Sequence, residues 1–426
     1  MQQTNCQATA QRSTTTSMTQ AFASSMPSSA GKGPWRERIL FNALQTTFGA
    51  GTIGRLEVVL PAGASVMLGD DGEAPGRIML RSWRPVWRLA TRGSLGLAEG
   101  YMQGEIDTPD LGAVLRFFVR NFATLESAGG GMAKPRLVDV LWHKRRRNSL
   151  QGSRRNIAAH YDLGNDFYKL WLDPGMTYSS AIYRTGGMTL VEAQDEKYRA
   201  VLDQIDVKPG DKLLEIGCGW GGLAERAIRR GAHVTGLTLS NEQLDFAREH
   251  LKRAGLDQHA DLRLEDYRVT SGTYDAIASV EMIEAVGEEH WPRYFTTLYD
   301  RLRPGGRAVI QAITIDERYF ESYRRQADFI QRYIFPGGML PTVTRMRDEA
   351  TQAGLTFETV ERFGHSYART LTDWRDAFRA RWPDITAQGF DERFRRMWEY
   401  YLTYCEAGFK NGDVDVGIYR MTKPAR

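Results

Sequence analysis

Leu213-Leu-Glu-Ile-Gly-Cys-Gly-Trp-Gly-Gly222 is the segment of this chain that indicates its fold most clearly. A short apolar run, typical of a buried strand, passes into the spacing Gly217-x-Gly219-x-x-Gly222, and a helical pattern follows. Glycine lets the backbone approach a ligand closely, and the first N–H groups of a helix have no partners within the helix. The stretch therefore predicts a cofactor site at the end of a strand.

Strands and helices alternate on both sides of this turn. The pair Thr189 and Glu192 has the spacing of a capping box and opens a helix that we expect to run through Ile205. Further helices are expected at 223–230, 241–254 and 394–409, and strands at 212–216, 233–237, 260–264, 274–280 and 307–313. This alternation is typical of an α/β domain with a mainly parallel, doubly wound sheet.

The chain has 426 residues, which is enough for more than one domain. We expect a disordered tail at 1–33, where Ser, Thr and Gln dominate, and a small α+β domain at 34–128. A basic linker at 129–155 and a catalytic domain at 156–426 complete the predicted organisation. Residues 1–155 hold 20 Lys and Arg against 11 Asp and Glu, while the net charge of the whole chain is +4. This basic part is expected to meet an anionic partner.

The composition argues against a fibrous, collagenous or wholly disordered protein. Hydrophobic residues make up 42% and charged residues 25% of the chain, which are ordinary globular values. We find no run of about 20 uncharged apolar residues that would predict a membrane-spanning helix. The three cysteines, Cys6, Cys218 and Cys405, lie far apart, so we expect no disulfide framework and no metal site. A cytoplasmic protein fits these features best.

The neighbours of the glycine turn favour S-adenosylmethionine (SAM) over a nicotinamide. A nicotinamide site usually has an acid at the end of the second strand, about 20 residues on, to hold the ribose. That strand ends here in Gly236-Leu-Thr-Leu-Ser240, which contains no acid. Glu215 instead stands two positions before the first glycine, where a carboxylate suits the ammonium group of the methionine part. A nicotinamide site stays the alternative.

A series of motifs then resembles one family, the cyclopropane-fatty-acyl-phospholipid synthases and the related mycolic-acid and fatty-acid methyltransferases. The motifs occur at 156–168, 176–181, 214–222, 236–243, 279–287 and 333–338, followed by an aromatic C-terminal helix. The resemblance is strong over about residues 156–420 and weak over 35–150. It implies the Rossmann-like sheet of SAM-dependent methyltransferases, preceded by a small α+β domain.

The resemblance also implies a reaction and a cofactor site. Such enzymes transfer a one-carbon unit from SAM to the double bond of an unsaturated acyl chain, usually in a membrane phospholipid. One segment covers the cofactor, the glycine turn holds its methionine part, and the ends of the second and third strands face the ribose and the adenine. The matching positions are Tyr178, Ser179, Glu215, Gly217, Gly219, Trp220, Gly221, Thr238, Gln243 and Asp266.

In this family a bound bicarbonate acts as the base. The positions that would hold it here are Ser180, Glu284, Gln311, Ile313 and Tyr367. Ser180 replaces a cysteine of the family and Gln311 replaces a histidine, but both side chains can still bond an anion. We therefore expect methyl transfer and favour closure of a cyclopropane ring. A methylene or methyl branch is the alternative product.

Two further features have weaker implications. Cys405 matches a cysteine that has been regarded as catalytic, although this reaction needs no covalent thiolate. The aromatic residues Tyr333, Phe335, Trp398 and Tyr401 suit the wall of an acyl tunnel, yet a stripe at helical spacing is also typical of an ordinary core.

The expected partners are an unsaturated phospholipid substrate and an anionic membrane surface. The run His143-Lys-Arg-Arg-Arg147 would attract such a surface, which implies peripheral association with the inner face of the membrane. We expect no nucleic acid, because no known recognition motif accompanies the basic charge. A homodimer is left open. A small-amine N-methyltransferase and an inactive lipid-binding protein are the competing functions, and the complete glycine turn with Glu215 and Glu284 argues against the second.

Overall fold

The computed structural model describes residues 52–69, 75–121, 163–325 and 327–425, together with the single positions 40, 42, 44 and 48. The expected tail at 1–33 and the basic linker at 129–155 lie outside the described residues, as does the first part of the motif at 156–168.

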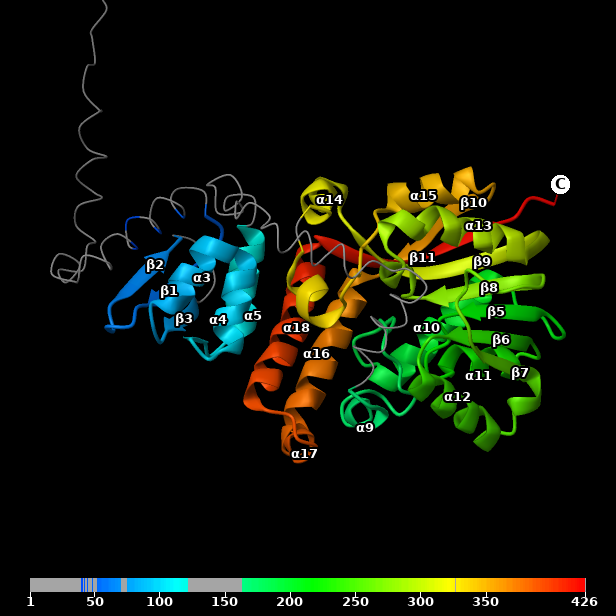
Figure 1. Cartoon of the computed structure of the whole chain (residues 1–426), viewed down its shortest axis with the longest axis horizontal. Helices are drawn as coiled ribbons and strands as arrows, with labels where there is room; N and C mark the ends of the chain where they lie inside the picture. Colours follow the sequence, from blue (N-terminus) through cyan, green and yellow to red (C-terminus); the bar gives the residue numbers. More distant parts are fainter. Residues whose placement is uncertain are drawn as a thin grey trace, which may run out of the picture.

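A seven-stranded sheet forms the centre of the larger domain (Figure 1). Its strand order is β10-β11-β9-β8-β5-β6-β7. The strands are β5 (Lys212–Ile216), β6 (His233–Thr238), β7 (Ala260–Leu264), β8 (Tyr274–Val280), β9 (Leu302–Ile315), β10 (Thr356–Arg362) and β11 (Val414–Thr422). Strands β7, β6, β5, β8 and β9 pair in parallel, and β11 is antiparallel to both of its neighbours. The prediction of a mainly parallel, doubly wound sheet is confirmed.

Helices cover both faces of this sheet and make two separate cores. Side chains alternate along a strand, so Leu213 of β5 lies in one core and Leu214 in the other. The covering helices are α10 (Leu190–Ile205), α11 (Gly222–Arg229), α12 (Asn241–Arg253), α13 (Trp291–Arg301) and α15 (Val343–Gln352). The capping box is present at the start of α10, where Thr189 and Glu192 each bond the backbone of the other.

The structure departs from the sequence prediction at the far strands. Strand β9 begins at Leu302 and not at Arg307. The segment that was predicted as a turn before the strand is part of it, and the pairing of β9 with β8 shifts its register there. Gly305 in this segment has a φ angle of +76°. Strands β10 and β11 were not predicted. Strand β11 lies against β9 across the whole of Val414–Thr422, a pairing between distant parts of the chain that local patterns do not reveal.

The smaller domain has a four-stranded sheet in the order β2-β1-β3-β4. The strands are β1 (Leu56–Val59), β2 (Ser65–Leu68), β3 (Gly76–Leu80) and β4 (Ile106–Asp107). The helices whose full bounds the structure describes here are α3 (Arg84–Arg92), α4 (Ser94–Met102) and α5 (Leu111–Arg120).

A pair of long helices connects the two sheets. Helices α16 (Gly364–Ala380) and α18 (Glu392–Asn411) pack together between them, with the short α17 (Trp382–Ala387) at their end (Figure 1). Arg396 of α18 donates hydrogen bonds of 3.1 Å to the carbonyl oxygens of Tyr101 and Ile106. Helices α4 and α5 also pack against α18, so the smaller domain contacts α18 through both helices and β4.

Within the part of the chain that the structure describes, no helix has the length and apolar character needed to cross a bilayer.

Candidate active site

The carboxyl ends of β5, β6, β8 and β9 meet at one edge of the large sheet, where ligands of doubly wound folds bind. The glycine turn follows β5, residues 238–240 end β6, and two glutamates follow β8. Helix α16 and the loop between α9 (Asn165–Tyr168) and α10 complete the surroundings. Most of the predicted site residues gather at this edge.

The glycine turn is open on one side. Gly217, Gly219 and Gly221 have φ angles of +83°, +52° and +90°, which favour glycine. A Cβ on Gly217 would lie 2.9 Å from Cγ of Met282, and one on Gly221 would lie 3.2 Å from Cβ of Ala247. A Cβ on Gly219 would meet no atom within 4 Å. The turn therefore presents bare backbone to a free space, as a cofactor cradle requires.

Two buried ionisable groups near this turn, Glu215 and Lys197, influence each other electrostatically. Burial raises the pKa of Glu215 to about 8 and lowers the pKa of Lys197 to about 7, and each group partly offsets the shift of the other. Oε2 of Glu215 is shielded from solvent and has no hydrogen-bond partner among the described residues. A cationic group such as the ammonium of an amino acid would supply the missing partner.

The loop over the turn is attached firmly to α10. Gln194 donates from Nε2 to the carbonyl oxygen of Ser179 at 2.9 Å, and Nζ of Lys197 donates to Oγ of Ser179 at 2.6 Å. The neighbouring Tyr178 shares a hydrogen bond of 2.9 Å with the hydroxyl of Tyr401 on α18. The loop thus joins α10 to the C-terminal helices across the edge of the sheet.

The end of β6 holds Gln243 in one orientation. Oγ1 of Thr238 donates to Oε1 of Gln243 at 2.8 Å, and Oγ of Ser240 caps α12 by accepting from the Gln243 backbone N–H at 3.2 Å. An amide that accepts through its oxygen points its N–H donors elsewhere. This arrangement suits the predicted contact with a ribose hydroxyl.

Two predicted cofactor residues have protein partners. The carboxylate of Asp266 is bonded at both oxygens by the guanidinium of Arg268, at 2.8 and 2.6 Å. An adenine at this position would therefore meet an ion pair and not a free carboxylate. Trp220 donates from Nε1 to Oδ1 of Asn165 at 2.8 Å, and its ring lies 5.5 Å from that of Tyr168.

Sequence reasoning missed Glu281, the first residue after β8. Its Oε1 accepts from the Ser180 backbone N–H and from Nε2 of Gln311, both at 2.8 Å. Its Oε2 accepts from the Tyr367 hydroxyl at 2.7 Å. Three of the positions expected around bicarbonate therefore bond a carboxylate of the chain itself. The spacing Glu281-x-x-Glu284 was the available signal, since it places two acids at the end of one strand.

Glu284 occupies a less polar place beside Glu281. Its Oε1 accepts from the Ile313 backbone N–H at 2.5 Å, and its Oε2 has no partner among the described residues. Burial, followed by the negative charge of Glu281, raises the pKa of Glu284 to about 8. At neutral pH Glu284 is therefore mostly protonated. Burial also raises the pKa of Glu281, while its three hydrogen bonds and the neighbouring Lys197 oppose that rise.

Aromatic rings form a wall beside the two carboxyl groups. The Tyr178 ring lies 5.3 Å from that of Trp374 and 6.4 Å from that of Phe335, and the Phe335 ring lies 6.1 Å from that of Tyr401. Trp374 and Tyr367 both lie on α16, and the centres of their rings are 6.1 Å apart. Trp374 was not among the residues predicted for the site from the sequence.

Cys405 lies on α18 close to this wall but has the character of an inert thiol. Burial, and then the negative charge of Asp328, raise the pKa of Cys405 far above its ordinary value. The thiol is therefore protonated, whereas a nucleophilic cysteine needs surroundings that stabilise its thiolate.

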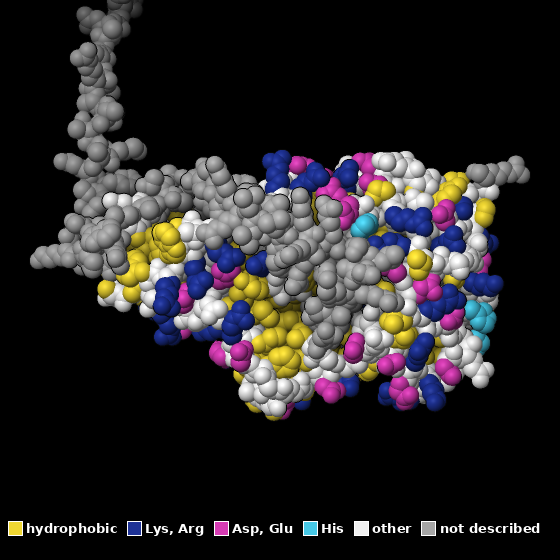
Figure 2. All heavy atoms as spheres, viewed as in Figure 1, with side chains coloured by type: hydrophobic (Ala, Val, Ile, Leu, Met, Phe, Trp, Pro, Cys, Tyr) yellow, Lys and Arg dark blue, Asp and Glu magenta, His cyan; other side chains and the backbone are white. Residues whose placement is uncertain are grey.

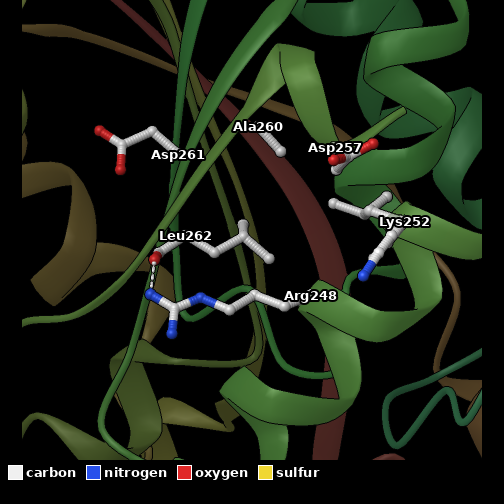
Figure 3. A pocket seen from close by; sticks show the side chains of 7 residues that line it. Arg248, Lys252, Asp257, Ala260, Asp261 and Leu262 are labelled. Carbon is white, nitrogen blue, oxygen red and sulfur yellow. Dashed lines mark hydrogen bonds between the residues drawn. The ribbon is translucent and has the colours of Figure 1, made fainter. Parts of the chain in front are cut away.

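A separate pocket of about 340 Å³ lies at the far edge of the sheet, between α12 and β7 (Figure 3). Arg248 spans it and donates to the carbonyl oxygen of Leu262 at 2.7 Å. The pocket shares no residue with the carboxylate cluster, so we do not assign it to the reaction. Among the described residues, no group of His, Cys, Asp and Glu side chains could hold a metal ion.

The doubly wound sheet, the open glycine turn and the acidic groups beyond β8 define a SAM-dependent methyltransferase. A family model described as mycolic acid cyclopropane synthetase matches residues 148–418. The chain belongs to this family of lipid methyltransferases, and SAM is its cofactor. The nicotinamide alternative is thereby excluded.

Several known proteins are similar to this chain. Tuberculostearic acid methyltransferase UfaA1 of Mycobacterium tuberculosis is 40% identical over 354 residues, which cover 81% of this chain and 83% of that protein. Cyclopropane-fatty-acyl-phospholipid synthase of Escherichia coli K12 is 34% identical over 357 residues, covering 81% and 87%. The crystal structure of mycolic acid cyclopropane synthase CmaA1 complexed with SAH and CTAB has 31% identity and a TM-score of 0.61, covering 63% of this chain and 98% of that one.

Proposed function

We propose that the protein transfers a one-carbon unit from SAM to the double bond of an unsaturated fatty acyl chain of a phospholipid and forms a cyclopropane fatty acid. The observation that supports this most is the pair Glu281 and Glu284 beside an aromatic wall, at the same edge of the sheet as the glycine turn. Ring formation needs an electrophilic methyl group, stabilisation of a positive charge and a base. The site offers residues suited to each of these needs.

The roles of the residues follow from their chemistry. Bound SAM supplies an electrophilic methyl group. The backbone of Gly217–Gly221 and the amide of Gln243 would hold it, with Glu215 facing its ammonium group. The loop at Tyr178 and Ser179 would exclude water from the site. This matters because an alkene is a weak nucleophile and water would otherwise compete with it for the methyl group. The faces of Tyr178, Trp374 and Tyr401 would stabilise positive charge on the acyl chain.

A methylene or methyl branch is the second candidate product. The relative of 40% identity is named for tuberculostearic acid, and Ser180 and Gln311 differ from the cysteine and histidine of the family pattern. A hydride shift before the loss of a proton from the new methyl group would leave a methylene branch, which a separate reductase would have to saturate.

A small-amine N-methyltransferase has less support. The structure of coclaurine N-methyltransferase is similar with a TM-score of 0.57, but its 17% identity indicates the fold alone. The lipid relatives match at about twice that identity.

We further propose that the protein works as a peripheral protein at an anionic membrane surface, on its cytoplasmic side. Helix α3 presents Trp87, which is 72% exposed, and Arg84 three residues earlier, whose side chain is 81% exposed. An exposed Trp beside Arg suits the boundary between headgroups and acyl chains. Figure 2 shows Lys and Arg side chains over this domain, with a hydrophobic area beside it over α18.

The product is tested with vesicles of oleoyl phosphatidylglycerol, SAM and the purified protein. Gas chromatography with mass spectrometry should detect an acyl chain enlarged by one CH₂ unit, and proton NMR should show cyclopropane and not olefinic methylene signals. Acyl chains that stay unchanged while an amine is methylated would overturn the lipid assignment.

Membrane docking is tested by sedimentation with the same vesicles. Trp87→Ser and added salt should each release the protein. Val269→Ser removes another exposed hydrophobic side chain, which is 63% exposed and lies in the larger domain, and it should bind as the wild type does. Equal binding by all three proteins would overturn the assignment to α3.

A further inference from the structure

We propose that Glu281 is the general base of this reaction, so that a carboxylate of the chain takes the place of bound bicarbonate. The inference rests on the proposed one-carbon transfer and adds the identity of the group that removes the proton.

Three donors from three separate elements converge on the Glu281 carboxylate. They come from the loop at Ser180, from β9 at Gln311 and from α16 at Tyr367, which lie 101, 30 and 86 positions away in the sequence. The donors are a backbone N–H, an amide and a hydroxyl, and none of them carries a charge. The carboxylate is therefore held in place without the direct ion pair that would weaken it as a base, in contrast to Asp266 with Arg268.

The backbone at Glu281 is also unusual. Its φ angle is +48°, and among the described residues only Met176 and Asp206 share this property without being glycine. The Glu281 N–H donates to the carbonyl oxygen of Gln311 at 2.8 Å, which fixes the backbone as well as the side chain. Non-glycine residues in this region of φ cluster at functional sites, because the surroundings must enforce them. The residue as a whole is half-buried.

The second carboxyl group is a poorer candidate. Glu284 accepts one hydrogen bond, whereas Glu281 accepts three, so the negative charge of the pair is better stabilised on Glu281. The raised pKa of Glu284, to about 8, leaves it protonated at neutral pH and unable to accept a proton. Of the two groups, Glu281 is thus the one whose hydrogen bonds favour the charged form, and Glu284 is its neutral neighbour.

Bicarbonate has no comparable place to bind. Ser180, Gln311 and Tyr367 already direct their donors at Glu281. A second anion would lie next to that carboxylate with only the protonated Glu284 left among the predicted positions to donate to it, which is unfavourable in a site of low polarity. The position that an external base would need is the one that the Glu281 carboxylate fills.

The proton-transfer step balances with Glu281 alone. After the methyl group has joined one alkene carbon, the other carbon is cationic. One C–H bond of the new methyl group breaks, and its proton goes to Oε2 of Glu281. The electron pair of that bond forms the last C–C bond of the ring and neutralises the cation. The proton is exchanged with water when the product leaves.

The test uses the full-length protein in buffer freed of carbonate under nitrogen. The wild type should keep its turnover when bicarbonate is removed. Glu281→Gln keeps the shape of the side chain but cannot take up a proton, so turnover should fall by about a hundredfold or more. SAM affinity, measured by calorimetry, should change less than about threefold, because Glu281 does not hold the cofactor.

A second variant removes the carboxylate and leaves space for an added base. Glu281→Gly suits the φ angle of +48° and opens a cavity lined by the donors of Ser180, Gln311 and Tyr367. Its turnover should be lost and then restored at least about tenfold by bicarbonate or formate. Glu281→Gln has no such cavity and should not be restored, which makes it the matched control.

The outcomes separate the two proposals. A wild type that loses turnover without bicarbonate, a Glu281→Gln variant with near-wild-type turnover, or a folded Glu281→Gly variant that neither anion restores would each overturn Glu281 as the base. A wild type that forms no modified acyl chain with or without bicarbonate would overturn the proposed function instead.

Discussion

Tyr367 donates a 2.7 Å hydrogen bond from its hydroxyl to Oε2 of Glu281, although 86 positions separate the two residues in the sequence. Burial and the negative charge of Glu281 raise the pKa of Tyr367, so this hydroxyl stays protonated and remains a donor. The bond links α16 to the end of β8. Helix α16 in turn packs against α18, which contacts α4 and α5 of the smaller domain.

The first prediction concerns this bond. Tyr367→Phe should lower kcat by about 10- to 100-fold, since a hydrogen bond to a charged group contributes about 1.5–3 kcal/mol. The KM for SAM should stay unchanged, because Tyr367 orients the carboxylate and does not hold the cofactor. Tyr400→Phe is the control, as Tyr400 is a buried tyrosine of α18 that packs against Phe329. A loss of kcat in both variants would indicate damage to the core instead.

The second prediction concerns the glycine turn. Gly219→Ala should weaken SAM binding at least about tenfold in calorimetry, because the methyl group would enter the free space of the cradle. Gly255→Ala is the matched control, since its φ angle of +70° imposes similar strain and its Cβ also meets no atom within 4 Å. Equal SAM affinity in the two variants would show that the open side of Gly219 does not face the cofactor.

The features that the sequence predicted well are local ones. The strand and glycine turn at 212–222 and the capping box at Thr189 each depend on a few neighbouring residues, and the structure contains both. The gathering of Ser180, Gln311 and Tyr367 followed from the family resemblance, which identified positions but not the group they would bind.

The features that the sequence did not predict depend on distant contacts. Glu281 is a site residue because three donors that are distant in the sequence bond its carboxylate, and only the folded structure brings them together. Strand β11 needs β9 as a partner, about a hundred residues earlier. Asp266 is a different case, because its partner Arg268 stands only two positions away. This ion pair could have been predicted from the sequence.

The third prediction concerns Lys197, which no motif had indicated. Lys197→Met removes the donor to Ser179 and the amine that interacts with Glu215 and Glu281. SAM affinity should fall by about tenfold, because a buried hydrogen bond that orders the covering loop is lost. Lys169→Met, on the exposed end of α9, should bind SAM like the wild type. Unchanged affinity in Lys197→Met would show that the loop is ordered by other contacts.

The last prediction is a dependence of stability on pH. The pKa of Glu284 is about 8 in the folded protein and about 4.5 in an unfolded chain. Between these values the unfolded chain has lost a proton that the folded protein keeps, so the stability contributed by Glu284 is complete below about pH 4.5 and is lost as the pH rises to about 8. Glu284→Gln is neutral at every pH, and its melting temperature should therefore fall less than that of the wild type between pH 5.5 and 8.5. Circular dichroism measures this difference, and Glu249→Gln, which alters an exposed carboxylate on α12, should follow the wild type. Parallel curves for Glu284→Gln and the wild type would mean that Glu284 ionises as an ordinary glutamate, which would remove the reason for keeping it neutral beside Glu281.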